Sequence, residues 1–401
     1  MNPDLERLQP YPFERLARLK ADCTPPAELA PIDLSIGEPK HAAPHFVAET
    51  LISHLHGLSQ YPVTRGQAEL RRTIADWLQR RFTLPAAGPD PDTQVLPVGG
   101  TREALFAFAQ AVVDRSQPRP RVLMPNPFYQ IYEGAALLAG AEPVFLNTTA
   151  QTDYLPDFDR VPDSVWDECQ LLYLCSPGNP TGTVLDVPAL QRLIELAERH
   201  DFIIAADECY SEIYPDEAAP PPGLLQAAAA MGRSDYRRCV VFHSLSKRSN
   251  LPGLRSGFVA GDAGVLQAFF RYRTYHGCAM PPATQAASRE AWQDEAHVRD
   301  NRELYRRKFA AVTDILQSVL PVTPPQAGFY LWPQTPIADT DFARNLFAEA
   351  HVTVLPGSYL SRDTDSGNPG SDHVRMALVA PLEDCIEAAR RIRTFIERIN
   401  A

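Results

Sequence analysis

The chain has 401 residues, of which 45% are hydrophobic and 22% are charged, and its formal net charge at neutral pH is -11. This length and composition are those of a globular protein with room for one large α/β domain and a smaller partner domain, and they exclude a disordered chain. The acidic balance argues against a nucleic-acid-binding protein, which would need a broad basic face to neutralise phosphates.

The cysteines and the N-terminal residues indicate where the protein works. Seven cysteines are spread along the chain without a C-x-x-C pair, which favours reduced thiols over a disulfide framework or a zinc site, so we expect no metal. No apolar run approaches the length of a membrane span. Residues 1–20 carry charges where a signal peptide would be apolar. We therefore expect a cytoplasmic protein without a membrane or nucleic-acid partner.

The first elements along the chain are an arm and a short strand. Residues 1–31 contain several prolines and read as an arm rather than a packed element. The run IDLSIGEPK, residues 32–40, is turned by Gly37 and Pro39. It is either an ordinary strand end or a backbone that approaches a ligand closely at Gly37, which glycine permits.

An amphipathic helix follows, entered through a turn at Gly66. Its apolar residues Leu70, Ile74, Trp77 and Leu78 recur at helical spacing. Just upstream lies Tyr61, which on this observation alone is more often a packed aromatic residue than a ligand contact.

Two strand-turn-helix units come next. In QVLPVGGTREALFAFAQAVV, residues 94–113, the turn Gly99-Gly100-Thr101 precedes a helix whose free N–H groups would suit a phosphate. A plain turn between strand and helix would look the same. The second unit, residues 121–146, carries Phe128 and Tyr129 in its loop, and either ring could face a heteroaromatic cofactor or pack in the core.

The next two strands end in polar residues. LLYLCSPGNPTG runs into a turn at Asn179, and FIIAADECYSEIY reaches Asp207 after an apolar run. Functional groups gather at the carboxyl ends of strands in a parallel α/β sheet. A buried Asp207 needs a partner, although a solvated turn aspartate is an equal alternative. The alternation of strands and helices over residues 95–260 predicts one doubly wound domain, with an antiparallel strand at RSGFVAG.

The stretch FHSLSKRSNLPGLRSGFVAG, residues 242–261, carries the strongest chemical signal. Lys247 directly follows Ser246, stands three residues after Ser244 and is followed by Arg255. A lysine loses its proton and attacks carbonyls readily when it is desolvated or near a cation, and hydroxyls with a guanidinium match a phosphate. Together they suggest pyridoxal phosphate bound as an imine. A basic surface loop is the alternative.

From about residue 285 the pattern changes to a long polar helix through residue 318, followed by short strands and two further helices. This predicts a smaller α+β domain. Within it, Arg375 sits in the apolar run HVRMALV, where an isolated arginine needs an anion. Residues 361–372 have the composition of a mobile loop.

These motifs resemble, in their order, the class I/II aminotransferases of the pyridoxal-phosphate fold type I superfamily, over nearly the whole chain. The most specific are SPGNPTG, AADECY and SLSK followed by GLRSG. The resemblance implies a large domain with a mostly parallel mixed sheet flanked by helices, plus a smaller α+β domain. It divides the chain into an arm with part of the small domain (1–45), a large cofactor-binding domain (46–284) and a small C-terminal domain (285–401).

The resemblance also implies roles for individual residues. Lys247 would be the Schiff-base lysine, and Asp207 and Tyr129 would join it as catalytic residues, the first pairing with the pyridine nitrogen and the second stacking on the ring. Tyr61 would reach the phosphate of the neighbouring subunit, so a homodimer with shared sites is expected. The other implied contacts are Asn179 and Tyr210 for the ring oxygen, Gly100, Thr101, Arg102, Ser244, Ser246 and Arg255 for the phosphate, and Gly37, Asn179 and Arg375 for the substrate.

The loop after Lys247 looks closest to proteobacterial succinyldiaminopimelate aminotransferases, because residues 248–252 replace the aromatic or glycine-rich run of many relatives. This implies amino transfer between N-succinyl-LL-2,6-diaminopimelate and 2-oxoglutarate in lysine biosynthesis. Cations expected to meet the distal carboxylates are Lys40, Arg65, Arg248 and Arg273.

Other functions remain open at this point. The alternatives within the family are an aminotransferase for aspartate, alanine or aromatic amino acids, and a C–S lyase. A transcription regulator would need a DNA-binding domain before the first motif, where only about thirty residues stand. A nucleotide-binding module would need a G-x-G-x-x-G turn after its first strand, which this sequence lacks.

Overall fold

The computed structural model describes residues 1–86 and 88–401, and a seven-stranded sheet forms its centre, in the order β2-β8-β7-β6-β5-β3-β4. Strand β8 is antiparallel to both its neighbours and the other pairs are parallel. This confirms the mostly parallel mixed sheet and its antiparallel strand. The strands are β2 (Val95–Val98), β3 (Arg121–Asn126), β4 (Glu142–Asn147), β5 (Cys169–Cys175), β6 (Ile203–Asp207), β7 (Cys239–Ser244) and β8 (Gly257–Gly261).

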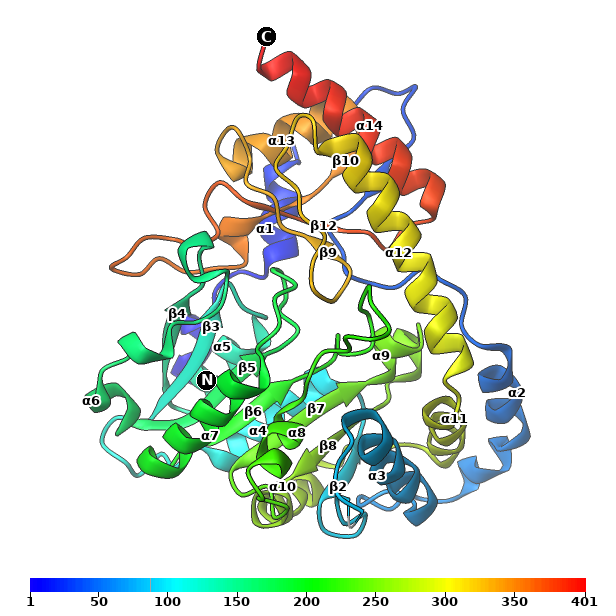
Figure 1. Cartoon of the computed structure of the whole chain (residues 1–401), viewed down its shortest axis with the longest axis vertical. Helices are drawn as coiled ribbons and strands as arrows, with labels where there is room; N and C mark the ends of the chain where they lie inside the picture. The colour runs from blue at the N-terminus through cyan, green and yellow to red at the C-terminus, as the bar shows by residue number, and fades with distance from the viewer. Residues whose placement is uncertain (87) are drawn as a thin grey trace.

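Helices cover both faces of this sheet, which explains why its central strands are apolar throughout rather than alternating. One face packs against α3, α7, α8 and α11 and the other against α4, α5 and α10 (Figure 1). These helices are α3 (Ala68–Phe82), α4 (Thr101–Val112), α5 (Ile131–Leu138), α7 (Val187–His200), α8 (Leu224–Ala230), α10 (Ala263–His276) and α11 (Pro282–Gln293).

The predicted amphipathic helix is α3, and its four apolar residues lie in the core. Leu70, Ile74, Trp77 and Leu78 are all buried, and Trp77 packs edge-on against His243 at a centroid distance of 5.2 Å. The helical spacing thus placed one face of α3 on the sheet beside the strand that leads to Lys247.

A second, smaller layer lies above the large sheet in Figure 1. It contains an antiparallel sheet in the order β11-β12-β9 and the parallel pair β1-β10, and a separate hydrophobic core joins these strands to α12, α13 and α14. Its elements are β1 (Ile32–Asp33), β9 (Tyr330–Leu331), β10 (Val352–Thr353), β11 (Leu355–Pro356), β12 (Val374–Ala377), α12 (Ala296–Leu316), α13 (Asp339–Ala350) and α14 (Leu382–Ile399).

The single long helix predicted for residues 285–318 is wrong, because the chain forms two helices, α11 and α12, with a break at residues 294 and 295. The Asp294 carboxylate accepts a 3.0 Å hydrogen bond from the backbone N–H of His297, a free donor in the first turn of the second helix. Helix α11 crosses residue 285 and packs against α2 (His45–Ser53) and α3, while the domain limits given above stay a prediction.

The predicted mobile loop at residues 361–372 makes specific contacts with the large layer. Arg362 binds both carboxylate oxygens of Glu133, at 2.8 and 2.5 Å, and its backbone N–H donates to Asn126 Oδ1 at 3.0 Å. Composition alone did not reveal these anchors.

The remaining described helices are short. They are α1 (Pro12–Leu19), α2 (His45–Ser53), α6 (Asp163–Trp166) and α9 (Leu245–Arg248), with the 3-10 turns η1 (Pro3–Arg7), η2 (Leu55–Ser59), η3 (Ala150–Thr152), η4 (Phe158–Arg160), η5 (Pro252–Leu254) and η6 (Gly357–Tyr359).

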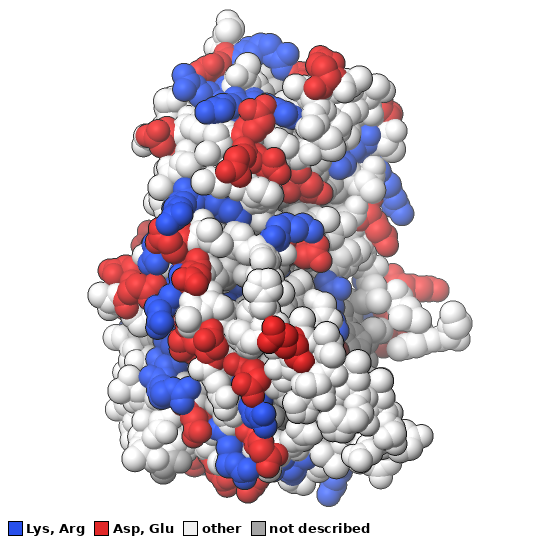
Figure 2. Space-filling model, turned by 90° about the vertical axis from the view of Figure 1, so that its right-hand side faces the viewer, with Lys and Arg blue, Asp and Glu red and all other residues white. Residues whose placement is uncertain are grey.

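Charged side chains of both signs are interspersed on the face shown in Figure 2, which carries no broad basic area. Among the described residues no helix is both long and apolar enough to cross a membrane.

Candidate active site

A cavity of roughly 520 Å³ opens where the carboxyl ends of β5, β6 and β7 meet the smaller layer. Strand ends are where the chain can leave the sheet and place side chains in a crevice. The cavity is lined by predicted site residues from both layers: Gly37, Thr101, Arg102, Tyr129, Asn179, Asp207, Tyr210, Ser244, Ser246, Lys247, Arg255 and Arg375.

Lys247 lies on α9, the single turn that follows β7, and its amine points into the cavity. Its Nζ donates a 2.5 Å hydrogen bond to the carbonyl oxygen of Gly37. Burial lowers the pKa of Lys247 to about 8, and the positive charges of Arg375 and Arg102 act in the same direction. A nucleophilic amine is therefore available near neutral pH.

Asp207 ends β6 and is buried on the floor of the cavity. Its Oδ2 accepts a 2.7 Å hydrogen bond from the hydroxyl of Tyr132 and its Oδ1 a 3.3 Å bond from the backbone N–H of Cys209. Burial raises the pKa of Asp207. The carboxylate has only neutral hydrogen-bond donors among the described residues, so a protonated ring nitrogen would supply the charge that it lacks.

Tyr132 was missed by sequence reasoning. It lies one helical turn after Tyr129 on α5 and stacks on Tyr173 with a centroid distance of 4.7 Å. The spacing of two tyrosines three residues apart beside a predicted site was the available signal.

The start of α4 and the loop after Lys247 form an anion-binding corner. The Ser244 hydroxyl caps α9 by accepting a 3.1 Å bond from the backbone N–H of Ser246. Arg255, in a left-handed conformation, brings its guanidinium against Gly100 at the N-cap of α4. A Cβ at Gly100 would collide with that guanidinium, and the φ of 94° also favours glycine. Free helix N–H groups, hydroxyls and a guanidinium suit a phosphate.

Arg375 extends from β12 on the opposite side of the cavity. Its Nη1 donates to Asn179 Oδ1 at 3.0 Å and its Nη2 to the carbonyl oxygen of Ser35 at 2.7 Å, while its Nε is buried and has no partner among the described residues. Neutral acceptors leave the positive charge uncompensated. This residue can therefore bind a carboxylate, as predicted for an arginine in an apolar strand.

Tyr330 is a second residue that the sequence did not reveal. Its hydroxyl hydrogen-bonds to that of Tyr210 at 2.9 Å, and its ring lies under Arg375, 4.6 Å from centroid to guanidinium carbon. A Cβ at Gly37 would collide with the Tyr330 hydroxyl. Glycine at position 37 is therefore required by the close packing of the segment after β1 against β9.

Arg102 lines the rim of the cavity, and phenol groups hold it. Its Nε donates to the Tyr129 hydroxyl at 2.7 Å and its Nη2 to that of Tyr11 at 2.9 Å. Among the described residues no carboxylate lies within ion-pair distance of Arg102. Tyr11, from the N-terminal arm, was also missed by sequence reasoning.

Two of the four cations suggested for distal carboxylates are internal to the fold. Arg248 is buried and pairs with Glu295 at 2.6 Å, and Arg273 is buried and binds both oxygens of Glu103, at 2.8 and 3.0 Å. Neither lines the cavity, so the idea that they meet a substrate carboxylate is wrong.

The other two suggested cations lie outside the cavity as well. Lys40 is exposed and pairs with Glu38 at 2.7 Å. Arg65 donates to the carbonyl oxygen of Asp92 at 2.6 Å. Arg102, which the resemblance assigned to the phosphate, is a further cation that lines the cavity.

Tyr61 does not line the cavity of this chain and is fully exposed. An exposed tyrosine is compatible with the predicted contact to a neighbouring subunit, which stays a prediction. Exposed apolar residues gather in the same part of the chain, namely Ile52, Leu55, Leu58 and Val63.

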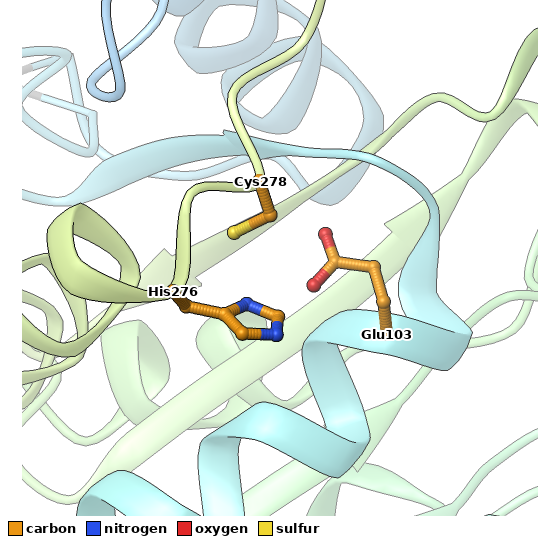
Figure 3. A group of neighbouring side chains, drawn as sticks. All are labelled: Glu103, His276 and Cys278. Atoms are coloured by element: carbon orange, nitrogen blue, oxygen red, sulfur yellow. The ribbon is translucent and has the colours of Figure 1, made fainter.

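A separate group of ligand-type side chains lies beside the first turn of α4, which carries Glu103 (Figure 3). Glu103, His276 and Cys278 place one potential ligand atom each within 4.8 Å of one another. Both Glu103 oxygens already accept hydrogen bonds from Arg273. That guanidinium balances the carboxylate charge and would repel a cation, so the group carries no argument for a metal centre.

The cavity thus combines a desolvated amine, a buried carboxylate, an anion-binding corner and an uncompensated arginine, which fit the aldehyde, ring nitrogen and phosphate of pyridoxal phosphate together with a substrate carboxylate. Fold and site define an enzyme of the pyridoxal-phosphate type I class. The sequence model described as "Aminotransferase class I and II" matches residues 30–392, and the chain belongs to this family, whose members use pyridoxal 5'-phosphate.

Similar proteins agree with this assignment. An LL-diaminopimelate aminotransferase of Nitratidesulfovibrio vulgaris is 30% identical over 97% of each chain. The crystal structure of an aminotransferase from Neisseria meningitidis is 48% identical, with a TM-score of 0.94 over 98% of this chain and 100% of that one. A probable N-succinyldiaminopimelate aminotransferase from Thermus thermophilus is 28% identical, with a TM-score of 0.84 over 96% and 99%.

Proposed function

We propose that the protein transfers the amino group of N-succinyl-LL-2,6-diaminopimelate to 2-oxoglutarate, or runs the same reaction in reverse, in the synthesis of diaminopimelate and lysine. The observation that carries this proposal is Arg102, a cation at the cavity rim that neutral phenols hold and that no carboxylate among the described residues compensates. With Arg375 it gives the cavity two places for carboxylates. A substrate with a second, distal carboxylate would use both.

The residues divide the work of amino transfer between them. When bound, pyridoxal phosphate supplies an aldehyde that bonds covalently to amines and a ring that takes up the electron pair released at Cα. Lys247 holds the cofactor between turnovers and then moves a proton away from or towards Cα, which its lowered pKa permits. Asp207 holds a proton at the ring nitrogen, and Ser244, Ser246 and Arg255 bind the phosphate.

Arg375 orients the substrate. A guanidinium that binds the α-carboxylate through two hydrogen bonds fixes the Cα–H bond relative to the amine of Lys247. Asn179 and the carbonyl oxygen of Ser35 hold this guanidinium in place before substrate arrives. Little reorganisation is then needed at the moment of proton transfer.

A second candidate donor is LL-2,6-diaminopimelate without the succinyl group, the substrate in the names of several relatives. Glu38 lines the cavity and could pair with the distal ammonium group that this donor carries and the succinylated one lacks. Its present partner, Lys40, is on the exposed side at 2.7 Å, so Glu38 could exchange that contact at little cost.

A donor screen tests these proposals. Purified cofactor-loaded protein is given 2-oxoglutarate and, in turn, the two diaminopimelate donors, aspartate, alanine and phenylalanine, and glutamate formation is followed. We expect the highest kcat/KM with the succinylated donor. Equal or better turnover of a simple amino acid would overturn the diaminopimelate assignment, and pyruvate and ammonia released without a keto acid would identify a lyase.

The proposed homodimer with shared sites needs its own test. Sedimentation of the purified protein should give twice the chain mass, and Tyr61→Phe should weaken cofactor binding without changing the mass. A monomer with full activity would contradict the shared site.

A further inference from the structure

The segment of residues 35–41, here called the strap, leads from the small layer towards the large one and lines the cavity with Ile36, Gly37 and Glu38. At its start, Leu34 is bonded on both sides to the small layer, by its N–H to Thr353 and by its carbonyl oxygen to the N–H of Ala377. The Ser35 carbonyl oxygen then accepts from Arg375, and that of Gly37 accepts from Lys247. Two residues with central roles thus both bond to the strap backbone.

The far end of the strap is held by one side chain. Of the described residues 38–44, His41 is the one whose side chain forms hydrogen bonds to another helix or strand. The other side-chain bond in this stretch, from Lys40 to Glu38, stays within the strap. Its Nδ1 lies 2.7 Å from Asn301 Oδ1, and its Nε2 lies 2.6 Å from Nζ of Lys308. Both partners are buried on α12.

The partners fix the protonation state of His41. Asn301 Oδ1 also accepts a 3.0 Å bond from Asn250 Nδ2, while Asn301 Nδ2 faces the carbonyl oxygen of Lys247 at 3.5 Å. Asn301 Oδ1 is therefore an acceptor, and His41 carries its proton on Nδ1. Its Nε2 is then a lone pair that accepts from the Lys308 ammonium.

Lys308 is unusual because it is buried without a carboxylate in ion-pair contact among the described residues. Its amine also donates to the carbonyl oxygen of Val379 at 3.2 Å and lies 5.2 Å from the Tyr305 ring centroid. The titratable groups facing the pair are Tyr305 on α12 and Glu383 and Cys385 on α14. A buried amine whose acceptors are all neutral depends on each of its hydrogen bonds, so the loss of either acceptor would be costly.

We propose that His41 and Lys308 are positioning residues, a tether that holds the strap over the catalytic lysine, and that protonation of His41 releases the strap. A proton on Nε2 would face the ammonium of Lys308 directly, where a lone pair stood before. Two like charges at hydrogen-bond distance in a buried site cannot both persist, so the contact opens.

The pKa values set the direction of this response. Burial lowers the pKa of His41, the hydrogen bond to Asn301 opposes this, and the charge of Lys308 lowers it further. Burial also lowers the pKa of Lys308 to about 8. A base whose pKa is lower in the docked state binds its proton less readily there, so docking is favoured above the ordinary histidine pKa of about 6.5 and is weakened as the pH falls below it.

Hydrogen exchange of the full cofactor-loaded protein tests the tether. His41→Leu removes both bonds, whereas His41→Gln keeps a neutral side chain that can accept from Lys308 and donate to Asn301. At pH 7.5 we expect strap amides to exchange about tenfold faster in the leucine variant, with the glutamine variant close to wild type. Lys308→Met should behave like the leucine variant, and Arg307→Met, at an exposed position of the same helix, should match wild type.

The pH dependence separates positioning from a merely structural role. After correction for intrinsic exchange rates, the strap amides of the wild-type protein should exchange faster as the pH is lowered from 7.5 to 5.5. The corrected exchange rate of His41→Gln should not change over this range. With L-glutamate as amino donor, His41→Leu should raise KM about tenfold with kcat within threefold, and His41→Gln should restore it. Equal pH dependence in wild type and His41→Gln, an unchanged strap in His41→Leu, or faster exchange in β6 as well as the strap would overturn the proposal. If the protein transferred no amino group from any donor, the proposed function would be contradicted, and the hydrogen-exchange results would still test the tether.

Discussion

The amine of Lys247 and the carbonyl oxygen of Gly37 are 2.5 Å apart, although 210 residues separate them in sequence. The lysine belongs to the turn after β7 in the large layer, and the glycine to the strap that leaves the small layer. The reactive group is thus held by backbone from the other layer. Any change that displaces the strap will reach the amine directly.

Gly37→Ala should show most clearly how displacement of the strap affects the amine of Lys247. The added Cβ would collide with the Tyr330 hydroxyl, and overpacking of this kind costs about 1–3 kcal/mol. We expect kcat/KM to fall at least tenfold, measured in the amino-transfer assay. Gly253→Ala is the matched control, because a Cβ there meets no atom within 4 Å. Equal activities of the two variants would mean that the strap tolerates displacement.

The pKa of Lys247 predicts how the apoprotein takes up its cofactor. The neutral amine attacks the aldehyde, and with a pKa of about 8 the fraction of neutral amine rises from pH 7 and levels off above pH 9. The rate of cofactor association, followed by absorbance, should rise with the same midpoint. A lysine with the ordinary value of 10.5 would still be gaining rate at pH 10.

Arg375→Gln tests whether the charge of Arg375 contributes to the lowered pKa of Lys247. Because the arginine charge lowers the pKa of Lys247, its removal should move the midpoint upwards.

Lys247→Ala should fold normally, as judged by its thermal transition, and should lose turnover. Substantial residual amino transfer in that variant would contradict the assigned role.

Lys247, Asp207 and Arg375 could be singled out from the sequence because each stands out chemically in an apolar or glycine-rich context. The order of strands brings Lys247 and Asp207 to one edge of the large sheet, whereas only the family resemblance indicated that Arg375, in the small layer, joins them. It did not reveal Tyr132 or Tyr330, since an aromatic residue in a helix or strand looks like ordinary core. Both contribute hydroxyl groups whose partners come from distant segments.

The cations suggested for the distal carboxylates were chosen by their charge alone, because the sequence does not show which of them are buried. Arg248 belongs to the run that suggested the succinyldiaminopimelate subgroup, yet its guanidinium is buried against Glu295. Sequence spacing cannot show whether a cation faces a cavity or an internal carboxylate.

Tyr132→Phe tests the support of the buried carboxylate. The lost hydroxyl bonds Asp207 at 2.7 Å and lowers its pKa, so without it the carboxylate takes up a proton more readily and holds the ring nitrogen less well. An unsatisfied buried group costs about 1–3 kcal/mol. We expect weaker cofactor binding, measured by equilibrium titration, and kcat lowered about tenfold. Tyr173→Phe, which removes a hydroxyl bonded to the Leu105 carbonyl oxygen instead, should leave both within threefold.

Arg102→Met tests the substrate assignment through a difference between donors. The side chain is exposed at the rim, so solvent screens its charge and we expect a loss of about tenfold in kcat/KM, or about 1.4 kcal/mol. The loss should appear as a higher KM for the succinylated donor and be absent for alanine, which has no distal carboxylate. Arg102→Lys should keep part of the preference, because it retains the charge but not the planar fork of donors. A uniform loss for both donors would instead place Arg102 at the phosphate, as the resemblance implied.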